Sequence, residues 1–89
     1  MDLIRTLNSV GKSTFVKYYY CFKDRSPDEC IAQFDENYTD KAKRSRTSHA
    51  KHIFREFKNL EALEIIVNSE RVDDSTRNKA KQILLHETR

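Results

Sequence analysis

One glycine and one proline, Gly11 and Pro27, are the only residues of either type in this chain of 89 residues. Tight β-hairpin turns depend on such residues at fixed positions, so little in the sequence supports hairpins. Charged residues make up 35% of the chain and apolar residues 37%, and the charged stretches have a helical period. Five Phe and four Tyr argue against disorder. The sequence predicts one all-α domain over residues 1–89, a compact orthogonal bundle of five or six short helices.

The spacing of apolar residues gives the expected helices. Phe15, Val16, Tyr19 and Phe22, for example, recur three and four positions apart. We expect helices over 2–8, from after Ser13 to about Lys23, over Pro27–Glu36 and Asp40–Phe57, after Asn59, and after Asp73 or Asp74.

Start and stop signals support these boundaries. Ser26-Pro27-Asp28-Glu29 has the form of a capping box, with Pro at the first helical position and Glu three residues after the cap. Thr39 is expected to cap the long helix that follows. Gly11 is expected to end the first helix. Ser13, Asn59 and Asp73 or Asp74 are expected to cap the others.

Basic residues are concentrated in one segment. The formal net charge is only +3. The segment 41–58, however, holds seven Lys or Arg residues and a single acid, Glu56, so the rest of the chain is net acidic. A segregated basic stripe is the electrostatic footprint expected for a partner rich in phosphate or in carboxylate.

The segment 27–57 has the elements of a helix-turn-helix, in which a first helix braces a second, basic one. Here the pair would be Pro27–Glu36 and Asp40–Phe57, joined by a turn of about three residues. At 100° per residue, the apolar side of the second helix holds Ala42, Ala50, Ile53 and Phe57. Lys43 and Arg46 lie nearer that side and are expected to snorkel out or to pair with Asp35 or Glu36. The opposite side is the candidate DNA-binding face, formed by Lys41, Arg44, Ser48, Lys51, His52 and Arg55.

The stretch Arg44–Glu56 resembles the end of region 4 of sigma-70-type factors. That recognition helix often reads Lys-Ser-Arg-Leu-Ser-Arg-Ala-Arg and, two residues later, Leu-Arg-Glu. Asp28-Glu29-Cys30-Ile31-Ala32 is similar to the bracing helix of the same region. Thr47 replaces the family's Leu, Lys43 replaces its usual Val, and the turn lacks the usual Gly. The identical positions are Ser45, Arg46, Ser48, Ala50, Arg55 and Glu56.

The resemblance implies promoter-type binding of duplex DNA, and the chain has no room for the polymerase-binding region of a sigma factor. We therefore expect a small transcriptional regulator that reads the major groove. Lys41, Lys51 and Arg55 would contact phosphates, whereas Arg44, Ser48 and His52 would reach base edges. A homodimer through residues 60–85 would span two half-sites, although the same segment is equally suited to bracing the core.

A second hypothesis uses the same basic stripe. The chain would then be a small helical interaction module, such as a phage- or plasmid-type adaptor or inhibitor, that docks on an acidic protein. Structured RNA is a further possible target of such a stripe. The sequence does not separate these partners, because each needs the same positive face.

Other motifs are weaker. Val10-Gly11-Lys12-Ser13-Thr14 looks like the end of a phosphate-binding loop, but Thr6 stands where the full motif needs Gly. His49 and His52 share a helix side without enough further ligands for a metal. No nucleophile–base arrangement is recognisable, so we expect no enzyme and no cofactor. Three consecutive tyrosines, Tyr18–Tyr20, point in different directions on a helix and are expected mainly to pack against the core rather than to stack on bases.

The compartment is expected to be the cytoplasm. No apolar run reaches the roughly 20 residues that a membrane span needs. Polar residues interrupt the N-terminal segment, which therefore lacks the apolar core of a signal peptide. Cys21 and Cys30 are too few for a disulfide framework and are expected to be free thiols.

Overall fold

The helices account for most of the chain in the computed structural model, which describes residues 1–89. No strand is present, and the all-α expectation is confirmed. Seven helices follow one another: α1 (Leu3–Val10), α2 (Lys12–Lys17), α3 (Tyr19–Asp24), α4 (Pro27–Gln33), α5 (Asp40–Arg55), α6 (Asn59–Val67) and α7 (Asp74–Glu87).

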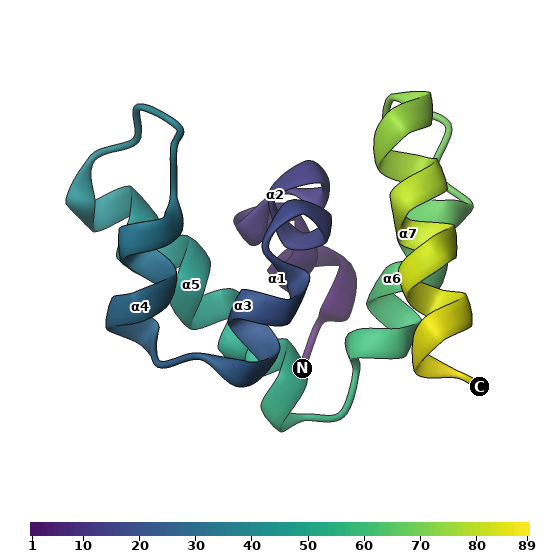
Figure 1. The fold of residues 1–89 in the computed structure, drawn as a ribbon, viewed down its shortest axis with the longest axis horizontal. Helices are drawn as coiled ribbons and strands as arrows, with labels where there is room; N and C mark the ends of the chain where they lie inside the picture. Colours follow the sequence, from purple (N-terminus) through teal and green to yellow (C-terminus); the bar gives the residue numbers. More distant parts are fainter.

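The helices form three neighbouring groups. In Figure 1, α4 and α5 lie on the left, α1 to α3 in the centre, and α6 and α7 on the right. The long helix α5 packs against α1, α3 and α4, and α6 packs mainly against α7. The longest helix, α5, has 16 residues, and none of the helices is both long and apolar enough to cross a membrane.

One continuous core joins the three groups. Its largest fully buried side chains include Phe15, Tyr19 and Phe22 from the central helices. The partly buried Phe54 of α5 stacks on Phe15, with ring centroids 5.8 Å apart. The segment 60–85 adds Leu63, Ile66, Ala80 and Ile83 to the core. Because these aromatic and aliphatic side chains come from distant parts of the sequence, they fix the position of α5 relative to the rest.

The helix expected from after Ser13 to about Lys23 is in fact two helices, α2 and α3. Tyr18 separates them with backbone angles of φ −111° and ψ 22°, outside the helical range. The break lets the Tyr18 ring lie against Phe34 (centroids 4.7 Å apart) while its hydroxyl reaches Asp35 and Glu36. Tertiary contacts therefore outweigh the local helical period at this position, and the bundle has seven helices instead of five or six.

The expected ends of α4 and α5 were also too late. α4 ends at Gln33, before Glu36 and Asn37, because Phe34 leaves the helix in an extended conformation and packs into the core. The connection to α5 is thus six residues, 34–39, and not a turn of about three. α5 ends at Arg55 instead of Phe57.

Three of the expected caps are present. The side chains of Ser26, Thr39 and Asp73 each accept a hydrogen bond from a backbone N–H three residues later. Ser13 does not cap α2, because it lies inside the helix and Gly11 occupies the cap position. Asn59 is the first residue of α6, and its amide donates to the Tyr19 hydroxyl instead of capping.

Candidate nucleic-acid interface

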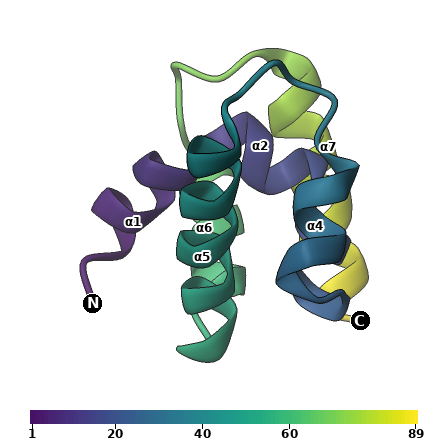
Figure 2. The same ribbon diagram turned by 90° about the vertical axis from the view of Figure 1, so that its left-hand side faces the viewer.

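Helix α5 lies at the surface with one side buried. Figure 2 shows it in front of α6, with α1 on one side and α4 on the other. Thr47, Ala50 and Ile53, three residues apart, form its buried side. The opposite side is therefore the one that a partner can reach.

The outer face of α5 carries most of the expected DNA-binding residues. Lys41, Arg44, Ser48 and Arg55 are exposed, and His52 is half-buried beside them. Lys41 and Arg55 make no ion pair within the chain, whereas Arg44 Nη1 lies 3.6 Å from Asp28 Oδ1. Both members of that pair are largely exposed, so water screens it strongly. The cations at the two ends of this face are free to neutralise an external anion.

Lys51 is held differently from the other expected contact residues. Its ammonium group donates to the backbone carbonyl of Arg25, the residue that follows α3. A cation at this position satisfies a carbonyl at the C-terminal end of a helix and interacts favourably with the helix dipole. Lys51 therefore anchors α5 to the α3–α4 junction, which the sequence did not reveal.

Arg46 neither snorkels out nor pairs with Asp35 or Glu36. Its guanidinium donates to the carbonyl of Val10, the last residue of α1, at 2.6 Å. The same group stacks over the Tyr38 ring, 4.2 Å from the centroid. Arg46 thus joins α1, α5 and the 34–39 connection, and its charge is directed inward.

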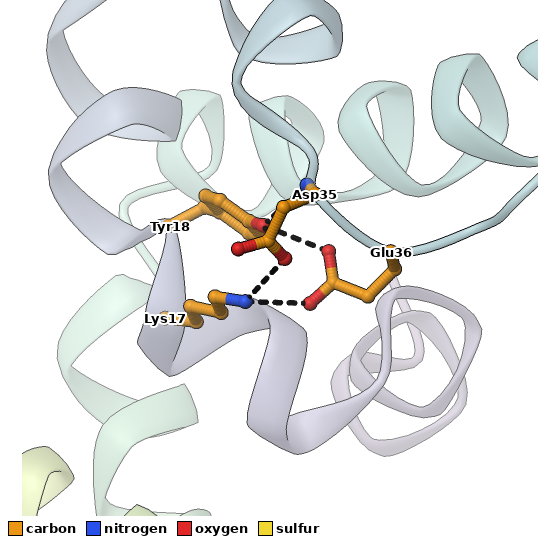
Figure 3. A network of polar contacts seen from close by, with 4 residues as sticks. All are labelled: Lys17, Tyr18, Asp35 and Glu36. Carbon is orange, nitrogen blue, oxygen red and sulfur yellow. Dashed lines mark hydrogen bonds and ion pairs between the residues drawn. The ribbon is translucent and has the colours of Figure 1, made fainter.

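Asp35 and Glu36 are instead bound by Lys17 and Tyr18, as Figure 3 shows. Lys17 Nζ lies 2.6 Å from Asp35 Oδ1 and 2.9 Å from Glu36 Oε2. The Tyr18 hydroxyl donates to Glu36 Oε1 at 2.7 Å and accepts from the Asp35 backbone N–H at 3.1 Å. This network fastens the connection that leads into α5 to the junction between α2 and α3.

The network changes the acidity of its members. The hydrogen bond from Lys17 lowers the pKa of Asp35 below its ordinary value. Burial raises the pKa of the Glu36 carboxyl, but hydrogen bonds from Lys17 and Tyr18 outweigh this, and the net shift is downward. Both carboxylates are therefore ionised at neutral pH, and their negative charges offset the positive charge of Lys17.

Phe57 was expected on the buried side of α5 but is 88% exposed. The helix ends before this residue, and the backbone of Phe57 takes a left-handed conformation with φ 55°. The helical wheel therefore does not apply to it, and the side chain projects away from the core. Ala50 and Ile53 are buried as expected, and Ala42 is half-buried.

The weaker motifs resolve into structural roles. Gly11 ends α1 with φ 92°, and its N–H donates to the Leu7 carbonyl. Lys12 Nζ donates to Ser69 Oγ at 3.2 Å. No group of three His, Cys, Asp or Glu side chains is arranged to hold a metal ion.

The cysteines and tyrosines follow the sequence expectations more closely. Both cysteines are free, and the Cys30 thiol donates to the Cys21 carbonyl at 3.0 Å. Tyr18 and Tyr19 are buried, whereas Tyr20 is 39% exposed. Tyr20 is one of the residues that line a surface hollow of about 430 Å³ formed by α2, α3, α4 and α7.

No family model, curated protein or solved structure matches this chain. Thr47 and Lys43 are the two positions at which a polar residue stands where the sigma-70 pattern has an apolar one, and neither is exposed. Thr47 is buried, in the place of the family's Leu, and its hydroxyl oxygen makes no hydrogen bond. Lys43 is half-buried.

Proposed function

We propose that the protein binds duplex DNA through the outer face of α5. The observation that carries the proposal is the composition of that face, where three exposed cations and a hydroxyl lie together and Asp40, in the first turn, is the one acidic residue of the helix. DNA phosphates supply the complementary charge, and side chains of these types are those that contact base edges. The residues of the proposed interface are Lys41, Arg44, Ser48, His52 and Arg55.

The dimensions of α5 suit a groove. At 1.5 Å per residue the helix is about 24 Å long, and the major groove, about 12 Å wide, admits an α-helix. Lys41 and Arg55 stand near opposite ends of α5 and would contact phosphates. Arg44, Ser48 and His52 lie between them and would reach base edges.

The supports of α5 favour a preorganised surface. Arg46 joins it to α1, Lys51 joins it to the α3–α4 junction, and the Tyr18 network fixes its leading connection. A helix held from three directions loses little further freedom on binding, which favours affinity. Lys51 and Arg46 are structural residues in the proposed interface and do not contact phosphates.

The test is fluorescence anisotropy with mixed-sequence duplex DNA over a salt series. A Lys41→Gln/Arg55→Gln variant removes two exposed charges from the outer face. We expect weaker binding and a slope of log affinity against log salt that is shallower by about two phosphate contacts, near 1.8 in magnitude. The matched control is Lys79→Gln/Lys81→Gln, which removes two exposed charges from α7.

The control distinguishes DNA binding at the α5 face from general electrostatic attraction to the whole protein. The α7 variant should bind like the wild type. If both double variants lose affinity equally, the net charge and not the α5 face controls binding. If the wild type fails to bind at low salt, the DNA proposal is wrong.

The second candidate is an acidic protein partner. Asp28 of α4 already lies against Arg44, so a carboxylate on a helix fits beside this face. Affinity that depends on DNA sequence would favour the first proposal over this one. Sequence-blind, salt-sensitive binding would not separate the two candidates, because a protein partner needs the same positive face.

The proposed homodimer through residues 60–85 is a separate question. Most large apolar residues of this segment are buried or partly buried within one chain, and Leu85 remains 63% exposed. Light scattering at working concentration tests the dimer, and a monomeric mass would count against it. DNA binding by α5 does not depend on that result.

A further inference from the structure

Phe57 combines two unfavourable features. It is the one residue other than glycine with a positive φ, and its side chain is 88% exposed. A bulky residue in the left-handed region pays for a steric clash between Cβ and the backbone. A single exposed apolar residue is unremarkable in itself, but exposure together with backbone strain calls for an explanation.

The turn after α5 shows where the strain comes from. The N–H of Phe57 donates to the Phe54 carbonyl at 3.1 Å, and the N–H of Lys58 donates to the Ile53 carbonyl at 3.0 Å. This pair of hydrogen bonds defines a Schellman motif with Phe57 at the left-handed position. Glycine is the usual residue there because it has no Cβ.

The Phe57 side chain therefore adds little to the stability of the fold. Glycine would satisfy the same hydrogen bonds without strain, and an 88% exposed ring gains little from burial. The exposed ring is held on a turn with defined hydrogen bonds, directly after the cationic face of α5. The side chain is thus suited to a contact outside the chain.

The neighbouring charges indicate which contact. Arg55 is exposed without an ion pair, and Lys58 lies beside the ring in sequence with only the exposed Glu61 as a partner. Proteins that bind unpaired nucleotides combine cations for the phosphates with aromatic rings on which bases stack. An apolar pocket in a partner protein would fit the ring but gives no role to the free cation two residues before it.

We propose that Phe57 stacks on an unpaired base next to the duplex bound by α5. The inference rests on the proposed function and narrows its substrate to duplex DNA with unpaired bases, such as a bulge. Arg55 would hold a phosphate while the Phe57 ring covers the base.

The experiment measures anisotropy with three probes of one sequence: an intact duplex, the duplex with a central two-base bulge, and the same bulge built from abasic sugars. The abasic probe keeps the flexibility of the bulge and removes the bases. We expect the wild type to prefer the bases over the abasic bulge by roughly 5- to 150-fold, the range for stacking of one base.

Two variants remove the ring while respecting the backbone. Phe57→Gly and Phe57→Asn both tolerate a left-handed conformation. Each should bind the two bulged probes equally, keep the wild-type salt slope, and melt at the same temperature as the wild type or higher. Leu85→Ala removes another exposed apolar side chain and should leave the preference intact.

Several results would overturn the inference. The wild type could bind both bulges equally. The Phe57 variants could keep the preference, or bind all three probes more weakly to the same degree. The variants could also lose stability, which would show that the ring is structural. In each case salt-dependent binding through Lys41 and Arg55 would still support DNA binding by α5. If no probe binds at low salt, the proposed function fails and this inference fails with it.

Discussion

The hydroxyl of Tyr18 accepts a hydrogen bond from the backbone N–H of Asp35 at 3.1 Å and donates one to Glu36 Oε1 at 2.7 Å. Tyr18 is the residue at which α2 and α3 separate, and Asp35 lies in the connection that leads into α5. One side chain therefore links the break in the central helices to the placement of the proposed interface.

Tyr18→Phe should destabilise the fold by about 1–2 kcal/mol, because the Asp35 N–H and the Glu36 carboxylate each lose a part-buried partner. Urea unfolding followed by circular dichroism measures the change. Tyr20→Phe is the matched control, since the Tyr20 hydroxyl has no hydrogen-bond partner within the chain. Equal stability of the two variants would show that the network contributes nothing.

Arg46→Met should lower stability by about 2 kcal/mol, because it removes a charged donor to Val10 and a cation over the Tyr38 ring. The salt dependence of DNA binding by Arg46→Met should remain that of the wild type. Arg55→Met should do the opposite and leave stability unchanged while reducing the salt slope. Thermal melts and anisotropy on both variants separate the roles. A reduced slope in Arg46→Met would mean that Arg46 contacts phosphate after all.

Thr47→Val should stabilise the protein by about 1 kcal/mol, because the buried Thr47 hydroxyl oxygen has no partner and a methyl group fills nearly the same volume. Thr39→Val is the same chemical change at the N-cap of α5. It should cost about 1 kcal/mol, since Thr39 Oγ1 accepts from the Ala42 N–H. Chemical denaturation measures both. If both substitutions change the stability in the same direction, the Thr47 hydroxyl is not unpaired or the Thr39 hydroxyl is not a cap.

Acid should destabilise the protein partly through Glu87. Burial raises the pKa of this carboxyl, but hydrogen bonds from Lys23 and Tyr19 outweigh burial, and the net pKa is lowered. A lowered pKa in the folded state gives stability that is complete above the unfolded value, about 4.3, and is lost as the pH falls through the folded value. Melting temperatures between pH 6 and pH 2.5 should therefore fall less steeply for Glu87→Gln.

Glu64→Gln is the control for the acid experiment, because Glu64 is exposed and forms no ion pair. Its pH profile should follow that of the wild type. A Glu87→Gln profile that also superimposes on the wild type would remove Glu87 from the explanation of acid sensitivity.

The helix caps and the buried side of α5 could be predicted from the sequence. Ser26 with Pro27, Thr39 and Asp73 each act within one helical turn, so their capping does not depend on the rest of the chain. The spacing of Ala50 and Ile53 correctly gave the buried side of α5. Lys41, Arg44, Ser48 and Arg55 are exposed on the opposite side, as the helical wheel indicated.

Long-range contacts explain what the sequence missed. The break at Tyr18 depends on Asp35, 17 residues away, and the inward position of Arg46 depends on Val10, 36 residues away. Contacts between residues so far apart in the chain leave no periodic pattern in the sequence. Phe57 was misplaced for a local reason, because the wheel was extended past the end of α5 into a left-handed residue where glycine is usual.

The contact between Arg46 and the α1–α2 junction also has an evolutionary consequence. A Cβ atom on Gly11 would lie 2.8 Å from Arg46 Nη1, and Gly11 has φ 92°. We therefore expect related sequences to change at positions 38 and 46 together. Where the arginine is replaced, the aromatic partner at 38 should no longer be required. The left-handed backbone alone would then continue to favour glycine at 11.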